Sequence, residues 1–499
     1  MSNNTKGGIT SGLIWAFGER ITAQLVSTIV TIILARILDP ENYGIISIVT
    51  VFISICNVFV TSGLGSAIVQ KKEVDSLDYN TAFIISFIIS LIMYLVLFLI
   101  SPYIANFYDM QELVLIIRVM GLRLPVASIN TIQQAHIRRE MAFKRFFIAT
   151  LFGTIISGVI GIVMAIKGFG VWALVFQYLT NTTVDTLILC FVSGWIPKFQ
   201  FSIIKCKEIF SFGWKVLATE LVYTLEGDIR SLLIGKVFGS SDLAYYDQGK
   251  KYPALLVNNI NSSISKVMLP AYSREQNNIF YLKQMLRKSI IIGIYILAPI
   301  LIGFAIVSQS FVETILGEKW LFCVPYIQIY CISYLTRPLE TACHQAILAI
   351  GRSDIVLYIM IIIHTIALGT VCIAVFIFKS VMLIAWGSLL STFISLLCFM
   401  ACVSKLIGYK IKEQIQDILP TLLICSLMGI VVYLIGCVNI NANYILIIQI
   451  IIGIILYLLF SVLFKIQAYN YLMSILEAKI GGKYIYKVKE LFKLRGIWQ

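Results

Sequence analysis

Long apolar runs separated by short polar segments dominate the hydrophobic pattern of this chain. Each run is rich in Ile, Leu, Val and Phe and can cross about 30 Å of hydrocarbon as a helix. The segments between the runs are short and hold most of the charges. The pattern therefore predicts an all-α membrane protein with about fourteen spans, at residues 11–38, 44–69, 79–104, 112–135, 146–166, 170–194, 209–235, 250–270, 286–307, 322–350, 355–378, 381–404, 417–437 and 442–464.

Basic residues are distributed unevenly between the two sets of loops. With the N-terminus placed in the cytoplasm, the cytoplasmic segments hold 25 of the 39 Lys and Arg residues, and the exported loops hold 6. An excess of positive charge in short loops marks the cytoplasmic side of a membrane. We therefore expect both ends of the chain to be cytoplasmic, and the first span to act as an uncleaved anchor, because no cleavage site follows a short apolar region.

Two parts of the chain follow the same plan. Residues 17–44 and 212–246 both begin Phe-Gly, continue as an apolar run, and end in a base, an acidic loop and a Tyr. The fourth predicted span contains Arg123-Leu124-Pro125, and the tenth contains Arg337-Pro338. This duplication indicates two halves of six spans each, related by an axis along the membrane normal.

The duplication divides the chain into four expected parts. These are an N-terminal six-helix bundle at residues 1–205, a C-terminal bundle at 206–405, two accessory helices at 406–464 and a basic cytoplasmic tail at 465–499. The tail mixes bases with Leu, Ile, Phe and Tyr, which favours an interfacial helix on the anionic inner leaflet.

Composition supports a membrane protein and excludes several other classes. The mean hydropathy is +0.91 and only 13% of residues are charged, against about 25% in soluble domains. The net charge of +14 is dispersed over short loops, so it does not indicate a nucleic-acid surface. The eleven cysteines and three histidines show no metal-ligand spacing, and no P-loop, G-x-S-x-G or H-E-x-x-H motif is present. We expect no cofactor and no metal.

The first duplicated stretch also carries a specific pattern. It consists of Gly12, Trp15, Arg20, Ala35, Arg36, Leu38, Pro40, Tyr43 and Gly44, and the basic segment at residues 136–146 follows. These stretches resemble the bacterial polysaccharide flippases of the Wzx type, in the multidrug/oligosaccharidyl-lipid/polysaccharide (MOP) exporter superfamily.

The resemblance implies a MATE-like fold and a transporter rather than an enzyme. The implied function is translocation of polyprenyl-pyrophosphate-linked oligosaccharide repeat units, such as undecaprenyl-linked ones, across the bacterial inner membrane. The products would be surface polysaccharides: O-antigen of lipopolysaccharide, capsule or exopolysaccharide. Membrane lipids, H⁺ or Na⁺, and a polysaccharide polymerase are the candidate partners, and no nucleic acid is expected.

Charged side chains inside the spans are the candidates for chemistry. One such charge at the bilayer centre costs about 2.5–3.5 kcal/mol on insertion scales. The seventh span holds several charges, so it must line a wet or protein-filled interior. Residues 337, 340, 341 and 344 are spaced three to four apart and share one face of a helix.

We expect four cations to face a central cavity and to bind the pyrophosphate, because guanidinium and ammonium groups attract phosphate oxygens strongly at low dielectric. They are Arg20, Arg123, Lys266 and Arg337. A second set would couple transport to an ion or form internal ion pairs that only fix helix packing. It comprises Glu19, Glu220, Glu226, Asp228, Arg230, Glu340 and His344. Asp185 in the sixth span is a weaker cavity candidate.

Three other functions compete with the flippase. A cation-coupled drug or metabolite exporter of the same superfamily would need an acidic, aromatic cavity with few bases. A lipid II flippase shares the architecture but lacks the opening pattern. A membrane-bound glycan-processing enzyme, such as a transferase, is disfavoured because no exported loop is long enough for a catalytic domain.

Overall fold

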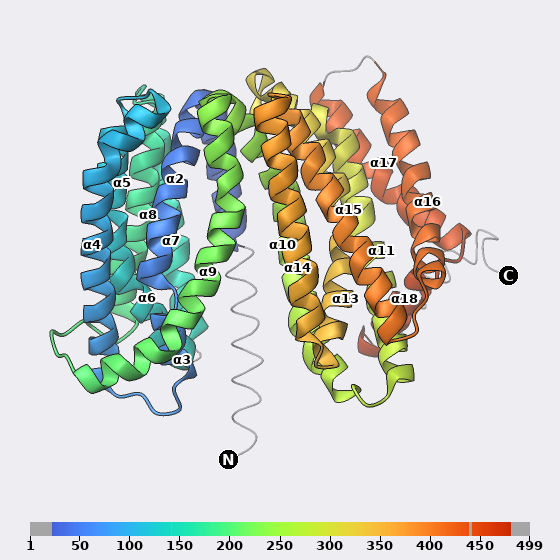
Figure 1. Cartoon of the computed structure of the whole chain (residues 1–499). Coiled ribbons are helices and arrows are strands. Elements are labelled where there is room, and N and C mark those ends of the chain that lie inside the picture. The colour runs from blue at the N-terminus through green and yellow to red at the C-terminus, as the bar shows by residue number, and fades with distance from the viewer. Residues whose placement is uncertain (1–21, 141, 439–441, 481–499) are drawn as a thin grey trace. The chain divides into compact units, whose positions relative to one another are not determined.

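The computed structural model describes residues 22–140, 142–438 and 442–480, which form helices joined by short loops and contain no strands (Figure 1). They separate into two compact units, Met1–Ala244 and Tyr245–Gln499. After the helix Thr22–Ile37, the first unit holds α2 (Pro40–Thr61), α3 (Leu64–Gln70), α4 (Ser76–Tyr108), α5 (Leu113–Gly121), α6 (Arg123–Glu140), α7 (Phe143–Ile166), α8 (Val171–Val192) and α9 (Ile203–Val237). α10 (Ser240–Arg274) begins at the end of this unit and continues into the second.

The second unit continues with α11 (Ile279–Phe311), α12 (Val324–Tyr334), α13 (Arg337–Ala349), α14 (Ser353–Cys372), α15 (Val381–Leu406), α16 (Ile411–Gly436), α17 (Ala442–Leu463) and α18 (Gln467–Ile480). A π-helical turn, Val312–Leu316, extends α11, and a second one, Ile373–Ile377, extends α14. A 3₁₀ segment, Glu318–Cys323, leads into α12.

The all-α membrane fold expected from the hydrophobic pattern is confirmed. Ten helical segments of the described chain are long and apolar enough to cross a membrane. A helix also lies within each of the fourteen predicted ranges, as far as the described residues reach. The other ranges hold the short helix Thr22–Ile37, the charged helices α9 and α10, and a span broken into α12 and α13. The exact number of spans stays a prediction.

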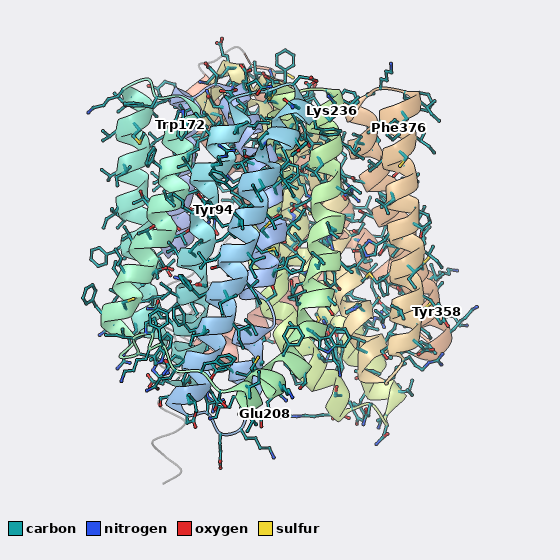
Figure 2. The ribbon with its side chains drawn as sticks, turned by 60° about the vertical axis from the view of Figure 1, so that its left-hand side comes forward. Tyr94, Trp172, Glu208, Lys236, Tyr358 and Phe376 are labelled. Carbon is teal, nitrogen blue, oxygen red and sulfur yellow. The ribbon has the colours of Figure 1, made fainter. Side chains whose placement is uncertain are left out.

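Helix α4 shows how the chain suits lipid. Its large side chains Leu95 and Leu99 are more than half exposed, whereas Ser86, Ser90 and Ser101 are fully buried. Ser86 donates a hydrogen bond across the helix interface to the carbonyl of Val60 at 2.8 Å, and the other two donate within α4. Small hydroxylated residues at helix contacts and apolar residues outside are the arrangement expected in a bilayer. Tyr358 of α14 and Phe376 of the π-helical turn that extends α14 likewise point outward (Figure 2).

Two glycines of the duplicated stretches allow close helix contacts in the first unit. A Cβ on Gly44 would lie 1.8 Å from the carbonyl oxygen of Ser240, at the start of α10. Gly63, at φ +88°, joins α2 to α3 and meets Gly213 of α9, where a Cβ would lie 2.2 Å from the Gly213 carbonyl oxygen. Only glycine fits at such backbone-to-backbone contacts. The motif glycines therefore bring α9 and the start of α10 onto α2 and α3.

Ion pairs join the ends of the helices on the side where the basic loops lie. Asp75 and Asp78 form a capping box at the start of α4. Lys71 lies 2.9 Å from Asp78 and 2.8 Å from Glu208 of α9, and Lys205 contacts Asp75 at 2.5 Å. Glu208 and Lys236 lie at opposite ends of α9, where Lys236 pairs with Asp109 at 2.8 Å (Figure 2). α9 is thus tied to α4 at both ends.

The apolar core of the second unit surrounds α11. Residues from α13, α15, α16 and α17 meet there, and Tyr457 of α17 donates a 2.6 Å hydrogen bond to the carbonyl of Tyr295 of α11. Arg287 of α11 holds Asp417 of α16 through two 2.6 Å hydrogen bonds. The two helices predicted to be accessory therefore share this core. The predicted division into residues 1–205, 206–405, 406–464 and 465–499 stays a prediction. Helix α9, most of which falls in the predicted C-terminal bundle, packs within the first unit.

Candidate functional site

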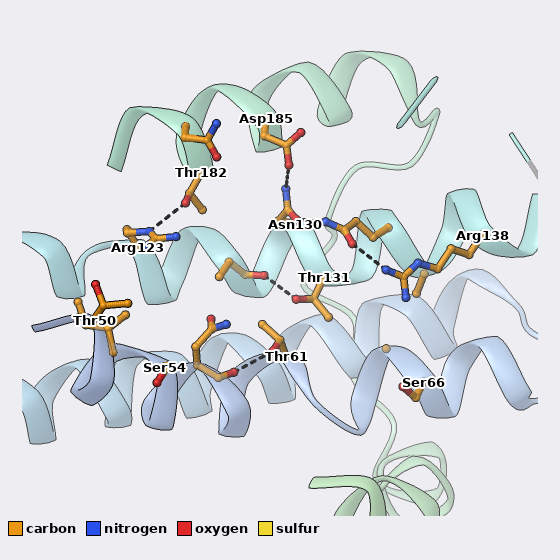
Figure 3. A pocket seen from close by; sticks show the side chains of 17 residues that line it. Thr50, Ser54, Thr61, Ser66, Arg123, Asn130, Thr131, Arg138, Thr182 and Asp185 are labelled. Carbon is orange, nitrogen blue, oxygen red and sulfur yellow. Dashed lines mark hydrogen bonds between the residues drawn. The ribbon is translucent and has the colours of Figure 1, made fainter. Parts of the chain in front are cut away.

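A polar cavity of about 520 Å³ lies inside the first unit, between α2, α3, α6 and α8 (Figure 3). Its wall contains six hydroxyl side chains, four carboxamides, two guanidinium groups and one carboxylate. The lining residues are Thr50, Ile53, Ser54, Asn57, Thr61, Gly65, Ser66, Arg123, Ala127, Asn130, Thr131, Gln134, Ala135, Arg138, Asn181, Thr182 and Asp185. Small-molecule sites typically have volumes of about 300–1,000 Å³, so the cavity is large enough for a ligand.

The polar face of α6 sets the length of this cavity. Residues 123, 127, 130, 131, 134 and 138 recur every three or four positions and fall on one side of the helix. At 1.5 Å per residue, Arg123 and Arg138 are separated by about 22 Å along the axis. Arg123 lies roughly 15 Å along the span that begins at Leu113, whereas Arg138 lies beside the basic loop. The cavity thus runs from mid-span to the basic-loop end.

Arg123 stands at the start of α6, just after the break at Leu122. Its Nε donates a 3.0 Å hydrogen bond to Thr182 Oγ1 of α8, and its guanidinium lies 5.3 Å from the ring centre of Tyr178. Pro125 near the helix start causes no loss of an internal hydrogen bond there. In the part of the chain that the structure describes, no carboxylate lies within 4.0 Å of the Arg123 guanidinium. The cation is therefore held by a neutral partner and keeps its charge for a ligand.

A chain of hydrogen bonds links Arg138 to Asp185 along the cavity wall. Arg138 donates to Gln134 Oε1 at 3.1 Å, Gln134 donates to Asn130 Oδ1 at 2.6 Å, and Asn130 donates to Asp185 Oδ2 at 2.8 Å. Asn130 also reaches Thr186 at 3.1 Å. The amide groups of this chain are thereby fixed in orientation.

The hydroxyl groups of the cavity are largely used as donors to their own helices. Thr61 donates to the carbonyl of Asn57 at 2.9 Å, Thr131 to that of Ala127 at 2.8 Å, and Thr182 to that of Tyr178 at 3.2 Å. Each hydroxyl oxygen keeps lone pairs that can accept a hydrogen bond. The middle of the cavity consequently presents acceptors, while the guanidinium groups at its two ends present donors.

Close packing of α7 against α8 positions Asp185 and Thr182. A Cβ on Gly153 of α7 would lie 3.3 Å from Cβ of Asp185, and one on Gly161 would lie 3.1 Å from Cβ of Gln177. Ser157, between these two glycines, accepts a 3.3 Å hydrogen bond from Asn181. Small residues at four-residue spacing let the two helices approach closely. The register of α8 on α7 therefore decides which α8 side chains reach the cavity.

The other residues predicted for the first unit have separate positions. Glu19 and Arg20 lie outside the described residues, as does the side chain of Glu226. Glu220 is exposed on α9. Asp228 of α9 accepts a hydrogen bond from Ser54, so it contacts the cavity wall, and Arg230 is partly buried on the same helix. Arg123 alone among the four predicted cations has a described side chain that lines this cavity.

Three of the predicted residues of the second unit, Arg337, Glu340 and His344, lie on α13. Nη1 of Arg337 lies 4.0 Å from Oε2 of Glu340, and its guanidinium lies 5.7 Å from the ring centre of Tyr334. Glu340 is buried and accepts a 3.3 Å hydrogen bond from Thr336. His344 packs edge-on against Phe399, and the side chain of Lys266 lies outside the described residues.

Sequence reasoning missed most of the neutral side chains of the cavity. Thr182, Asn181 and Asn130 are uncharged, so no insertion penalty singled them out, and Asp185 was only a weaker candidate. The available signal was the recurrence of polar residues at 130, 134 and 138, which places them on one face of a helix. Within the described ranges, no group of three or more His, Cys, Asp and Glu residues is placed to hold a metal ion.

Comparison with known proteins gives the context for this site. Residues 33–325 match the family described as polysaccharide biosynthesis protein. The teichuronic acid biosynthesis protein TuaB of Bacillus subtilis is 24% identical over 74% of this chain and 77% of its own length. The lipopolysaccharide biosynthesis protein WzxC of Escherichia coli is 22% identical over 69% and 70%, respectively. The succinoglycan biosynthesis transport protein ExoT of Rhizobium meliloti is 21% identical over 65% and 66%.

Solved structures with the same fold are transporters. The lipid II flippase MurJ, in an inward closed conformation, aligns with a TM-score of 0.73 and 16% identity, covering 93% of this chain and 100% of that one. An inward-facing multidrug resistance MATE transporter of the MOP superfamily aligns with a TM-score of 0.57 and 16% identity, covering 77% and 96%. These findings confirm the predicted family, the MATE-like fold and the prediction of a transporter rather than an enzyme. The chain belongs to the polysaccharide biosynthesis protein family and is a multi-pass membrane protein with the MOP fold.

Proposed function

We propose that this protein translocates polyprenyl-diphosphate-linked oligosaccharide repeat units across the bacterial inner membrane for the synthesis of a surface polysaccharide. Family membership and the names of the relatives support this substrate class. The structural observation that carries the proposal is Arg123, a cation at mid-span in a polar cavity, with a neutral hydroxyl partner and no carboxylate within 4.0 Å in the described chain.

The chemistry of Arg123 suits a diphosphate. Among the described residues, only its Nε is engaged in a hydrogen bond, to Thr182, so its two terminal nitrogens are available to phosphate oxygens. Guanidinium groups bind phosphate with two parallel charge-assisted hydrogen bonds, and low dielectric strengthens the attraction. The end of the cavity at the exposed Arg138 would receive the headgroup from the basic-loop side, while the lipid tail stays in the bilayer.

The orientation and mechanism follow from the same proposal. We assign the basic-loop end of the first unit, with Lys71 and Arg138, to the cytoplasm, and both chain ends with it. Transport would proceed by alternating access. Arg20, Lys266 and Arg337 are retained as further candidate headgroup cations. An undecaprenyl carrier, an H⁺ or Na⁺ gradient as the driving force, and a polysaccharide polymerase as partner also remain proposals.

Proteoliposomes containing a fluorescent polyprenyl-diphosphate oligosaccharide provide the test. Translocation is measured as protection of the label from a membrane-impermeant reductant. We expect the native protein to translocate the lipid and Arg123→Gln to reduce the rate at least tenfold, because the diphosphate loses its cation. Thermal unfolding of both proteins controls for folding.

Arg118→Gln is the matched control. Arg118 lies five residues earlier in the same span, but it contacts α4, with Nε 3.1 Å from Ser101 Oγ and the guanidinium 3.9 Å from the ring centre of Phe98. Its loss should change the rate less than twofold. No translocation by the native protein, together with transport of organic cations, would replace this proposal by the drug-exporter alternative. Transfer of sugar by the purified protein would instead favour the enzyme alternative.

A further inference from the structure

We propose that the middle of the first-unit cavity is a sugar-binding subsite in which Asp185 accepts hydrogen bonds from sugar hydroxyls and so makes translocation selective for the glycan. This inference rests on the proposed function and adds to it the part of the headgroup that this site recognises. The subsite comprises Thr50, Thr61, Asn130, Thr131 and Asp185.

The first argument is the unused hydrogen-bonding capacity of Asp185. Its Oδ2 accepts from Asn130 at 2.8 Å, but its Oδ1 is buried and has no partner among the residues that the structure describes. Thr50 Oγ1, on the facing helix α2, is also buried without a partner in that part of the chain. A buried polar atom left without a hydrogen bond costs about 1–3 kcal/mol. Both atoms line a cavity, so a ligand that donates hydrogen bonds would recover this free energy.

The second argument is the distribution of donors and acceptors along the cavity. The hydroxyl groups of Thr61 and Thr131 donate hydrogen bonds to backbone carbonyls at 2.9 and 2.8 Å, so their oxygen lone pairs remain available to accept hydrogen bonds in the cavity. With the carboxylate of Asp185, the middle region is rich in acceptors. Sugar hydroxyls supply donors, whereas a phosphate diester or diphosphate at neutral pH supplies acceptors only. The middle of the cavity is therefore matched to sugar.

The third argument is electrostatic. Asp185 is the one carboxylate among the described lining residues, and it lies between Arg123 and Arg138 on the facing helix. Like charges close together at low dielectric repel strongly. The carboxylate directs a diphosphate away from the middle and toward a guanidinium end, and so orders the headgroup along the cavity (Figure 3).

The surrounding residues hold the carboxylate in place. Asn130 is oriented by Gln134 at 2.6 Å, which is in turn oriented by Arg138 at 3.1 Å. The α8 backbone at Asp185 packs closely against Gly153 of α7, where an added Cβ would lie 3.3 Å from Asp185 Cβ. A fixed acceptor discriminates between ligands better than a mobile one, since a ligand lacking the hydroxyl leaves it unpaired.

Binding to the purified full-length protein in nanodiscs tests the inference. The probes are farnesyl diphosphate and a panel of farnesyl-diphosphate-linked sugars carrying glucose, galactose or N-acetylglucosamine. We expect the native protein to bind at least one sugar-linked probe ten or more times more tightly than farnesyl diphosphate. Asp185→Asn, which keeps the shape but replaces the free acceptor by a donor, should reduce this ratio at least fivefold. Its affinity for farnesyl diphosphate should stay the same or rise.

Asp109→Asn is the control, because Asp109 ends α4 in a left-handed conformation that Asn also tolerates, and it pairs with Lys236 at the exposed end of α9, away from the cavity. It should leave every affinity within twofold of the native protein. Equal binding of all probes by the native protein, or an unchanged ratio in folded Asp185→Asn, overturns the sugar subsite while leaving the flippase proposal intact. Binding of no probe at all, with no translocation in proteoliposomes, overturns the proposed function itself and the subsite with it.

Discussion

Two broken spans, α5–α6 in the first unit and α12–α13 in the second, show how one sequence motif acquires two electrostatic settings. Each span breaks near its middle, resumes with an Arg, and has a Pro within two residues. Each guanidinium also lies near a tyrosine ring, at 5.3 Å for Arg123 and 5.7 Å for Arg337. The difference is the polar partner, which is the neutral Thr182 for Arg123 and the carboxylate of Glu340 for Arg337.

This difference indicates that the two arginines attract anions to different extents. Glu340 partly neutralises Arg337 and is itself held by Thr336. Arg123 has a neutral hydroxyl partner and lies in a cavity whose other lining side chains are uncharged except for Arg138 and Asp185. We therefore infer that the duplicated motif places a cation at a similar position in each span, and that the neighbouring side chains decide how strongly it attracts an anion.

The largest expected effect comes from comparing the two arginines directly. Arg123→Gln should weaken binding of farnesyl diphosphate at least tenfold, whereas Arg337→Gln should weaken it less than threefold, because Arg337 is already paired with Glu340. Titration of the two purified variants, each checked for cooperative unfolding, measures the ratio. Equal losses would show that the Glu340 carboxylate does not screen Arg337 and would remove the distinction between the two spans.

The packing of α11 against Pro338 in the second span gives the next largest effect. A Cβ on Gly293 of α11 would lie 2.9 Å from Cβ of Pro338, so Gly293→Val overpacks the start of α13. Overpacking of this kind costs about 1–3 kcal/mol. The unfolding temperature should fall by several degrees, as measured by fluorescence in detergent. Gly303→Val is the control, since its nearest neighbour would lie 3.9 Å away, and it should change the unfolding temperature much less.

Removing the neutralising carboxylate should make the second span more like the first. Glu340→Gln keeps the volume and the acceptor for Thr336 but removes the charge beside Arg337. A partly exposed pair of this kind is worth up to about 1 kcal/mol. Affinity for farnesyl diphosphate should therefore rise two- to fivefold at low salt, and the gain should shrink at 1 M salt. A loss of affinity would mean that Glu340 positions Arg337 rather than screening it.

The smallest effect concerns the ion pairs at the basic-loop end of the first unit. The hydrogen bond from Lys205, together with a backbone hydrogen bond, lowers the pKa of Asp75 below its usual value. A carboxyl with a lowered pKa adds stability above its unfolded-state pKa and loses it as the pH falls through the folded pKa. Acidification below about pH 4 should thus lower the unfolding temperature of the native protein more than that of Asp75→Asn.

Lys71 gives the corresponding prediction for the dependence of the unfolding temperature on pH in the alkaline range. Hydrogen bonds to Glu208 and Asp78 raise the pKa of Lys71, so its contribution is present below the unfolded pKa and is lost as the pH rises through the folded one. Lys71→Met should therefore flatten the decline in unfolding temperature above about pH 10.5. A curve that matches the native protein would show that the contacts of Lys71 add nothing to the stability of this end.

The sequence by itself determined the membrane class, the helical segments and the family. Apolar length, short loops and dispersed bases are local properties of the chain, so they can be read without knowing which helices touch. The same reasoning found Arg123 and Arg337, because a charge in an apolar span is costly wherever the span packs. The stripe of Gly153, Ser157 and Gly161 at four-residue spacing is also visible in the sequence, but the sequence does not show which helix it contacts.

Only the tertiary structure decided what each charge faces. Thr182 and Asp185 belong to the site because α7 and α8 approach closely at Gly153 and Gly161, which fixes the register of α8 against α6. The free oxygen of Asp185 likewise depends on which of its neighbours Asn130 reaches. Contacts between residues 55 positions apart depend on helix packing, and hydrophobic periodicity reports only which face of a helix is apolar. For that reason the cations were predictable and their partners were not.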